Sequence, residues 1–414
     1  MSEQTVAPPA GSSRSASRAS RPLAARRGSV VKWVLIAALL GFLLVFPLYF
    51  DEFWLRTGFA VFGAAIGAIG LNLLVGTTGQ LSLAHAFFLA VGAVSYAYVS
   101  GESGGLGTRA GLEGLGLPPI VGMVVGVLLA GFAGLLFSPI AARLRGIYLG
   151  VASLGLVFIG VHVLNTWTPV TGGFNGRSVP EFSLFGFTFG NSDPQLWVLG
   201  VPFREAERLW YLGLVLLLAA YVFARNLLRS RPGRALQTLR DSEVAASVMG
   251  VNVQAYKARV FLVSSMYAGL SGVLYALSIG SIAPESFGLV VSIQYLAMIV
   301  LGGLGSVGGS VLGALFVTAL PLLFQQYADV LPLVSAPGQG GVSAGFAARY
   351  LYGAAIILVV LFEPAGLAGI GQRLTQRFRR GRAPARGGVP APPPEQPGSA
   401  PTPSDRPAQG SDTR

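Results

Sequence analysis

Apolar residues in this chain form long, nearly uncharged blocks separated by short polar segments. A helix needs about 20 residues to cross the hydrocarbon core of a bilayer, and several blocks approach that length. The pattern therefore predicts an all-α polytopic membrane protein. Its ten predicted helices are 31–50, 57–76, 81–99, 119–140, 147–165, 209–224, 260–279, 288–303, 309–325 and 348–366. Short glycine-rich links precede the third and ninth, which are also consistent with re-entrant segments.

The basic residues predict the orientation of these spans. With both termini in the cytosol, all but six of the 29 lysines and arginines fall on cytosolic segments. Positive charge on the inner side is the rule for membrane proteins. The net charge of +12 is therefore explained by topology rather than by a nucleic-acid partner. The six on the outer side are Arg56, Arg109, Arg177, Arg204, Arg208 and Arg349.

Composition predicts three regions. Residues 1–29 are rich in Ser, Ala and Arg without apolar periodicity, and are expected to form a disordered cytosolic N-terminal extension. Residues 30–370 are the predicted transmembrane domain. Its two long loops are an outer loop at 166–208 and a cytosolic loop at 225–259. Residues 371–414 are expected to be a basic, Pro-rich disordered cytosolic tail.

Several functions are disfavoured by what the chain contains. Only 11% of the residues are charged, against roughly 25% in soluble domains. Cysteine is absent and there are two histidines, so we expect no metal site, no catalytic residues and no cofactor. A G-x-G-x-x-G match at 303–308 lies between two predicted spans, which favours a tight turn over a dinucleotide site. No Walker motif occurs.

Charge inside the predicted spans is scarce. Apart from the two histidines, these spans contain only Lys32, Glu363 and Arg349, all near their ends. Ion-coupled carriers and pumps use ionisable residues within their spans. If the protein moves solute uphill, we therefore expect the energy to come from another subunit.

Small residues recur at every fourth position in two predicted helices. Gly63 and Gly67 form one pair, and Gly122, Gly126, Ala130 and Gly134 form a longer run. This spacing lets helix backbones approach closely within a membrane. We interpret these residues as packing sites rather than functional ones.

The loop at 225–259 contains a predicted short helix of about eight residues. Asp241 is its expected N-cap, Glu243 suits the first turn, and Gly250 is a suitable C′ residue. Such a helix could dock in a groove of a motor subunit. A solvated, inert loop is equally consistent with the spacing alone.

Several segments together resemble a known family. Glu243, Ala245, Ala246 and Gly250 resemble the coupling motif of ABC-importer permeases, with one residue inserted after the glutamate. The chain is similar to the permeases of branched-chain amino-acid ABC importers, specifically the longer of their two permease subunits. The likeness is carried, in the family's order, by 71–76, 79–88, 145–148, 171–176, 233–257, 301–306 with Gly313, and 364–367.

The chain departs from the family pattern at a few positions. Ser310 stands where proline is common, and Val94 stands where an aromatic residue is usual. Phe174 and Asn175 replace a more acidic or polar pair, and the related urea-importer permeases favour a Gly-Asn-Gly-like segment there. This difference bears on the substrate.

The resemblance implies a multi-pass permease in a bacterial inner membrane. Its expected partners are a second permease subunit, two cytosolic ABC ATPase subunits that bind ATP and Mg, and an external solute-binding protein. The complex would move branched-chain or similar small amino acids inward, and this chain would hydrolyse nothing. The alternatives are a urea or short-amide ABC importer permease and an ATP-independent channel or facilitator.

Three groups of candidate residues follow. Polar residues in or beside apolar helices either line a translocation pathway or bridge helices. The glycine-rich segment of the outer loop is either an outer gate or binding-protein contact, or a structural turn. The pathway group is Asn72, Gln80, Ser82, His85 and Gln294; the ATPase-coupling group is Arg240, Asp241, Glu243, Ala245, Ala246 and Gly250; the outer group is Thr171, Gly172, Gly173, Asn175 and Gly176.

Overall fold

The computed structural model describes residues 23–102, 112–144, 146–190, 196–198, 201–327, 344–362 and 366–369. All of them belong to one unit, Met1–Ile370. The tail predicted at 371–414, most of the predicted N-terminal extension, and residues Arg109, Arg145 and Glu363 lie outside the described residues.

A helix is present at each of the ten predicted windows. The first begins at Leu23, within the stretch expected to lack structure. These helices are α1 (Leu23–Val45), α2 (Glu52–Thr78), α3 (His85–Ser100), α4 (Pro119–Arg143), α5 (Ile147–Thr166), α7 (Glu205–Arg229), α10 (Val253–Ile279), α11 (Leu289–Gly302), α12 (Val307–Gln326) and α13 (Ala344–Phe362). The shorter helices are η1 (Phe46–Leu48), α6 (Thr168–Thr171), η2 (Gly173–Asn175), α8 (Arg231–Asp241), α9 (Glu243–Val248) and η3 (Pro284–Phe287).

Seven helical segments in the described part are long and apolar enough to cross a membrane. They are α2, α4, α5, α7, α10, α12 and the segment Pro284–Gly302, which joins η3 to α11. Three further apolar stretches are shorter: Val34–Leu48, His85–Ser100 and Arg349–Leu358. The chain is thus an all-α membrane protein with several spans.

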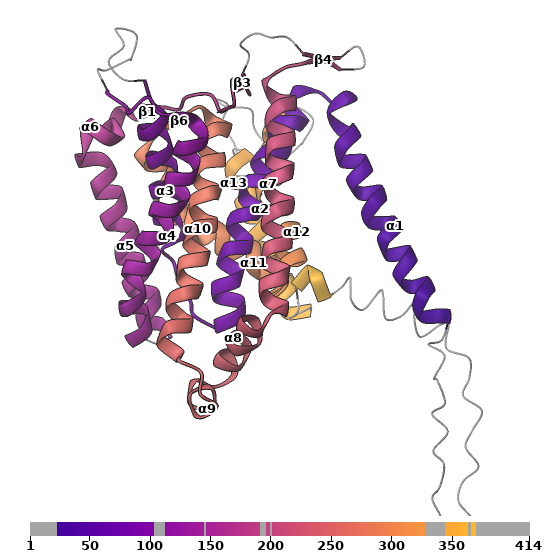
Figure 1. The fold of residues 1–414 in the computed structure, drawn as a ribbon, viewed down its shortest axis with the longest axis vertical. Helices are drawn as coiled ribbons and strands as arrows, with labels where there is room; N and C mark the ends of the chain where they lie inside the picture. Colours follow the sequence, from indigo (N-terminus) through magenta and orange to yellow (C-terminus); the bar gives the residue numbers. More distant parts are fainter. Residues whose placement is uncertain are drawn as a thin grey trace, which may run out of the picture. The chain divides into compact units, whose positions relative to one another are not determined.

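Short antiparallel strand pairs gather at one end of the helices, opposite α8 and α9 (Figure 1). Sequence reasoning did not predict them, because strands of two or three residues carry no periodic pattern. We call their end the strand end and the opposite one the α8–α9 end. The pairs are β1 (Arg177–Ser178) with β6 (Ser281–Ile282), β2 (Ser183–Leu184) with β3 (Phe187–Thr188), and β4 (Leu196–Val198) with β5 (Val201–Phe203).

Helix α10 lies at the centre of the bundle and packs against α2, α3 and α4. Glycines make this packing possible. A Cβ added at Gly92 would collide with the backbone of Gly269, and one at Gly272 would collide with the Leu89 carbonyl. A Cβ at Gly126 of α4 would lie 2.7 Å from the Gly92 oxygen. The backbones of α3, α4 and α10 therefore touch with no side chain between them.

The two small-residue series predicted from sequence lie at these helix contacts. A Cβ on Gly63 would lie 3.2 Å from Cβ of Leu274, and one on Gly67 would lie 2.7 Å from Oγ of Ser271, both in α10. In α4, Gly134 faces Ser265 of α10. The interpretation of these residues as packing sites is confirmed.

Helix α1 is attached to the bundle at its strand end. The Trp210 indole N–H of α7 donates to the Leu43 carbonyl at 3.0 Å, and the Tyr211 hydroxyl donates to the Leu44 carbonyl at 2.7 Å. The Phe46 ring stacks on Trp210 with centroids 4.7 Å apart. From there α1 leans away from α7 toward the α8–α9 end (Figure 1).

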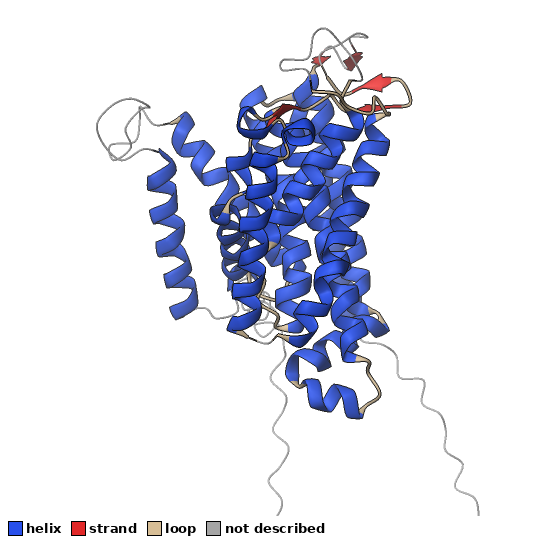
Figure 2. Ribbon diagram, turned by 90° about the vertical axis from the view of Figure 1, so that its left-hand side faces the viewer, coloured by secondary structure: helices blue, strands red, loops and turns tan. Residues whose placement is uncertain are grey.

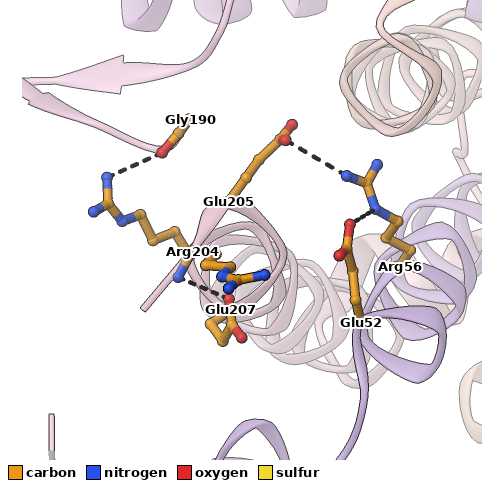
Figure 3. A network of polar contacts seen from close by, with 7 residues as sticks. Glu52, Arg56, Gly190, Arg204, Glu205 and Glu207 are labelled. Atoms are coloured by element: carbon orange, nitrogen blue, oxygen red, sulfur yellow. Dashed lines mark hydrogen bonds and ion pairs between the residues drawn. The ribbon is translucent and has the colours of Figure 1, made fainter. Parts of the chain in front are cut away.

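Charged residues connect the strand ends of α2 and α7 (Figure 3). Arg56 donates to Glu52 at 2.7 Å and lies 3.6 Å from Glu205. Glu207 accepts from the Arg204 backbone N–H at 2.9 Å, which caps the start of α7. The Arg56 side chain is 52% exposed, so its ion pairs contribute about 0–1 kcal/mol each.

We expect Gly272→Ala to destabilise the bundle, because the new methyl group would collide with the α3 backbone. Overpacking of this kind costs roughly 1–3 kcal/mol. Gly155→Ala in α5 is the matched control, since a Cβ there would meet nothing within 4 Å. Thermal unfolding of the purified variants in detergent measures the difference. Equal melting temperatures for the two variants would contradict the close packing of α3 and α10.

Candidate functional site

The predicted coupling helix is α9, which lies with α8 beyond one end of the long helices (Figure 2). Its N-cap is Ser242, whose hydroxyl accepts from the Ala245 N–H at 3.2 Å. The prediction of Asp241 as N-cap was wrong, because α8 continues through Asp241. Ser242 is the extended residue between the two helices, with φ −161°. The sequence analysis did not predict that the loop at 225–259 contains α8 as a second, separate helix.

Helix α9 ends as the sequence predicts. Gly250 has φ +80°, a left-handed conformation that favours glycine. Its N–H donates to the Ser247 carbonyl at 3.0 Å, and the Val251 N–H donates to the Ala246 carbonyl at 3.0 Å. This is a Schellman ending, with Gly250 at C′. Asn252 then caps α10, so α9 leads into the central helix with only a short link between them.

Glu243 anchors α9 to α10. Its carboxylate lies 2.7 Å from the Lys257 ammonium, and the Lys257 side chain is only 1% exposed. A buried ammonium needs a counter-charge, so this ion pair holds the start of α9 against the first turns of α10. Ala246 is fully buried beside it. Lys257 was missed as a functional residue, although it is the lysine nearest to the predicted coupling helix.

The opposite side of α9 carries exposed apolar residues. The exposed fractions are 70% for Val244, 82% for Val248 and 64% for Met249. Ala245 and Gly250 are exposed as well. We call Val244, Val248 and Met249 the α9 apolar surface. Apolar groups gathered on a short helix outside the bundle are typical of a contact with another protein.

Arg240 of α8 binds the end of α2. Its guanidinium donates to the Gly76 carbonyl at 2.7 Å. Gly76 lies in the last turn of α2, where unpaired carbonyls and the helix dipole favour a cation. Leu236 and Leu239 pack the buried side of α8 against the bundle. Arg240 thus connects the cytosolic loop predicted from sequence to a core helix.

Asn72 holds the turn between α11 and α12. Its Oδ1 accepts from the Gly305 N–H at 2.8 Å, and its Nδ2 donates to the Ser306 carbonyl at 3.0 Å and the Ser310 hydroxyl at 2.6 Å. The G-x-G-x-x-G stretch is therefore a helix–helix turn, as expected. Of the two roles considered for Asn72, these bonds are those of a residue that bridges helices.

A buried polar cluster surrounds the start of α3. The His85 and Tyr295 rings have centroids 4.6 Å apart, and the Tyr295 and Ser271 hydroxyls are 2.8 Å apart. Ser271 also donates to the Gly63 carbonyl at 2.7 Å. Tyr295 and Ser271 were missed from sequence, because a serine or tyrosine in an apolar helix gives no sign of its neighbours.

Gln80 and Ser82 lie in a buried, non-helical segment between α2 and α3. Within the described ranges, neither amide atom of Gln80 nor Nε2 of His85 has a hydrogen-bond partner. Unpaired buried polar atoms cost about 1–3 kcal/mol each, so they mark a place where a polar ligand group would bind favourably. Gln294 is half-buried. Among the described contacts, the residue of α11 that lies against His85 is its neighbour Tyr295.

The segment 171–176, predicted to lie in the outer loop, is a compact turn. The Thr171 hydroxyl donates to the Leu164 carbonyl at 2.7 Å and accepts from the Gly173 N–H at 3.1 Å. Gly172, Gly173 and Gly176 all have positive φ. Asn175 is exposed at the tip of the turn.

Arg177 holds this turn in place from its C-terminal side. Its guanidinium donates to the Val170 carbonyl at 3.0 Å and the Glu113 carbonyl at 2.9 Å. Burial lowers the pKa of the Arg177 guanidinium from its usual range. Arg177 begins β1, so the turn is connected through β6 to the end of α10.

The described helices define a helical, multi-pass membrane protein. The family described as the permease component of branched-chain amino acid transport systems matches residues 54–361. The chain belongs to this family, as the resemblance predicted.

Individual relatives are transport permeases. The branched-chain amino acid permease LivM of Escherichia coli is 32% identical over 72% of this chain. The ribose import permease RbsC of E. coli is 30% identical over 59% of this chain and 67% of its own length. BraD of Pseudomonas aeruginosa, another branched-chain amino acid permease, is 24% identical over 74% of this chain and 91% of its own length. The chain spans 66% of the length of LivM, and no solved structure matches it.

We expect Glu243→Gln to lower the free energy of unfolding by about 1–3 kcal/mol, because it leaves the Lys257 ammonium buried without a counter-charge. The loss stays below the ~3–5 kcal/mol of a fully buried pair, since the Glu243 side chain is 28% exposed. Adding Lys257→Met to the same chain should recover most of it.

Denaturation of the single and double variants forms a double-mutant cycle. Arg56→Gln, which breaks an exposed ion pair, is the control and should change stability by no more than ~1 kcal/mol. A double variant no more stable than Glu243→Gln would show that the ion pair does not anchor α9.

Proposed function

We propose that this chain is the transmembrane permease subunit of an ABC importer that moves branched-chain or similar small amino acids inward. The energy comes from separate ATPase subunits, which act through α9. The observation that carries this proposal is how α9 is capped, anchored and exposed. It is capped at both ends, joined to buried Lys257 by Glu243, and exposes apolar residues away from the bundle.

The proposed topology has ten spans with both termini in the cytosol of a bacterial cell, in its inner membrane. The α8–α9 end is then cytosolic and the strand end faces outward. The basic residues of 225–259 support this orientation, and the presence of a helix at each predicted window supports the number of spans. The shorter stretch His85–Ser100 follows a non-helical segment, 79–84, whose Gln80, Ser82 and Ala84 are buried in protein, and in this proposal the two together cross the membrane.

In this proposal α9 passes conformational change to the bundle through two connections. One is the Glu243–Lys257 ion pair to α10, and the other is the Arg240 bond to Gly76 of α2. Asn72 then joins α2 to the turn between α11 and α12. A partner that binds one arrangement of α9 more tightly than another would shift the whole bundle between two states.

The proposed pathway passes the polar cluster at the start of α3. Gln80, Ser82 and His85 are all buried. Within the described residues, the side chains of Gln80 and His85 also contain polar atoms that have no hydrogen-bond partner. These groups suit the polar backbone of an amino acid, while the surrounding apolar helices suit an aliphatic side chain. We keep Gln294, which directly precedes Tyr295 in α11, as a pathway residue, and assign Asn72 to bridging helices.

The partners of the complex are a second permease subunit, two ABC ATPase subunits, and a solute-binding protein outside. ATP and Mg bind to the ATPases. The outer turn at 171–176 contacts the binding protein or forms the outer gate, because its exposed tip is held on a rigid base. The LivM and BraD relatives support an amino-acid substrate over urea.

We expect Val248→Glu to abolish recovery of the ATPase subunits when the tagged chain is purified in mild detergent. A buried charge at the α9 apolar surface would remain unpaired on docking. Gln237→Glu, which adds the same charge on the exposed side of α8, is the control and should retain the ATPases. Mass spectrometry of the eluates and their ATPase activity measure the result.

If the wild-type chain purifies alone and still carries leucine into liposomes without ATP, it is a channel or facilitator and the proposal is wrong. Uptake of labelled urea in preference to leucine by the whole complex would overturn the substrate alone.

We expect Gly250→Ile to uncouple ATP hydrolysis from transport. A β-branched residue is strained at φ +80°, so the end of α9 would be distorted while the ATPases still bind. Gly250→Asn is the matched control, because asparagine tolerates this conformation. Leucine uptake per ATP hydrolysed, measured in proteoliposomes, should fall in the isoleucine variant and stay near the wild-type value in the asparagine variant. Normal coupling in Gly250→Ile would count against the role of α9.

A further inference from the structure

A groove between α1, α7 and the start of α12 plays no part in the function proposed above. Its volume is about 500 Å³, and Ile36, Arg225 and Gly308 are among its lining residues, one from each of the three helices. It lies toward the α8–α9 end, because Arg225 is near the last turn of α7 and Gly308 is in the first turn of α12.

The α7 side of the groove is basic. Tyr221, Arg225 and Arg229 all line it and recur at every fourth position, which places them along one face of the helix. In the described part of the chain, no carboxylate pairs with the guanidinium of Arg225 or Arg229. Within the described residues, the guanidinium groups of Arg225 and Arg229 therefore both line the groove without a carboxylate to neutralise them.

The α12 side of the groove adds hydrogen-bond donors. Val307 and Gly308 are in the first turn of α12, where backbone N–H groups lack an intrahelical acceptor. The Ser306 hydroxyl caps only the Gly309 N–H, at 3.0 Å. A Cβ at Gly308 would lie 3.8 Å from the Tyr221 hydroxyl, so that hydroxyl stands next to the helix start. Guanidinium groups, a hydroxyl and a helix N-terminus together favour a phosphate oxygen.

The third side of the groove is apolar. Helix α1 contacts α7 at the strand end and then leans away from it (Figure 1). Ile36 is the α1 residue that lines the groove, and on the adjoining surface of α1 Leu35 is 64% and Leu39 is 58% exposed. In a bilayer such surfaces are covered by acyl chains. The groove thus offers phosphate donors at the end of a membrane-length helix and apolar surface next to them.

We propose that this groove binds the headgroup of an anionic phospholipid whose acyl chains lie along α1. The phosphate contacts Arg225, Arg229 and the first turn of α12. An anionic lipid fits better than phosphatidylethanolamine, whose own ammonium would be repelled by the two arginines. Basic sites between helices at the inner surface of a membrane recognise anionic lipid headgroups. The bound lipid fills the space between α1 and the bundle, and the site is independent of the solute transported.

Native mass spectrometry of the full chain, purified in detergent and titrated with phosphatidylglycerol or phosphatidylethanolamine, tests the proposal. We expect phosphatidylglycerol to bind more tightly than phosphatidylethanolamine. The double variant Arg225→Gln with Arg229→Gln should weaken phosphatidylglycerol binding roughly 10- to 30-fold, since each basic contact contributes several-fold. The control is Arg143→Gln with Arg231→Gln, which removes two arginines that do not line the groove.

The control variant should bind phosphatidylglycerol as the wild type does. Equal weakening in both double variants would show a general effect of net charge and overturn the proposal. Equal binding of the two lipids would overturn it too. So would displacement of the lipid by millimolar inorganic phosphate, which would make the groove a site for free phosphate. The two variants should melt at similar temperatures without lipid, and a lower value for the groove variant alone would assign the arginines to folding.

Discussion

The close contact of three helix backbones around α10 is the constraint on which the rest of the structure depends. Gly92, Gly269 and Gly272 let α3 and α10 meet without intervening side chains, and Gly126 brings α4 into the same contact. In a membrane, apolar side chains gain little by leaving lipid for protein, so association relies on close packing and on polar contacts. The polar cluster and the coupling segment are both positioned by helices that this packing fixes.

Several polar contacts of the bundle lie where helices start or end. Asn72 bonds the turn between α11 and α12, Arg240 bonds the last turn of α2, and His85 begins α3. At such places the backbone leaves donors and acceptors unpaired, and side chains or ligands must satisfy them. The same reasoning applies to the proposed coupling segment, the proposed solute pathway and the proposed lipid groove, which all include helix termini.

Much of this architecture could be predicted from sequence, and the failures have physical causes. The ten helices, the packing glycines and the C′ role of Gly250 follow from hydrophobic blocks, spacing and φ requirements, which are local. Strands of two residues and the boundary at Ser242 are decided by tertiary contacts, so they were missed or misplaced. The partners of Glu243 and His85, namely Lys257 and Tyr295, are set by how helices meet, which a single sequence does not encode in any local pattern.

The length of α10 gives the molecule a direct link between its two ends. This helix has 27 residues and is therefore about 40 Å long. At one end Lys257 holds α9; at the other, the chain passes straight into β6, which pairs with β1 beside the outer glycine turn. Separating the ammonium of Lys257 from its carboxylate would be costly, so a displacement of α9 would carry the start of α10 with it. In the proposed function, a tilt of α9 would therefore reach the strand end through α10 itself.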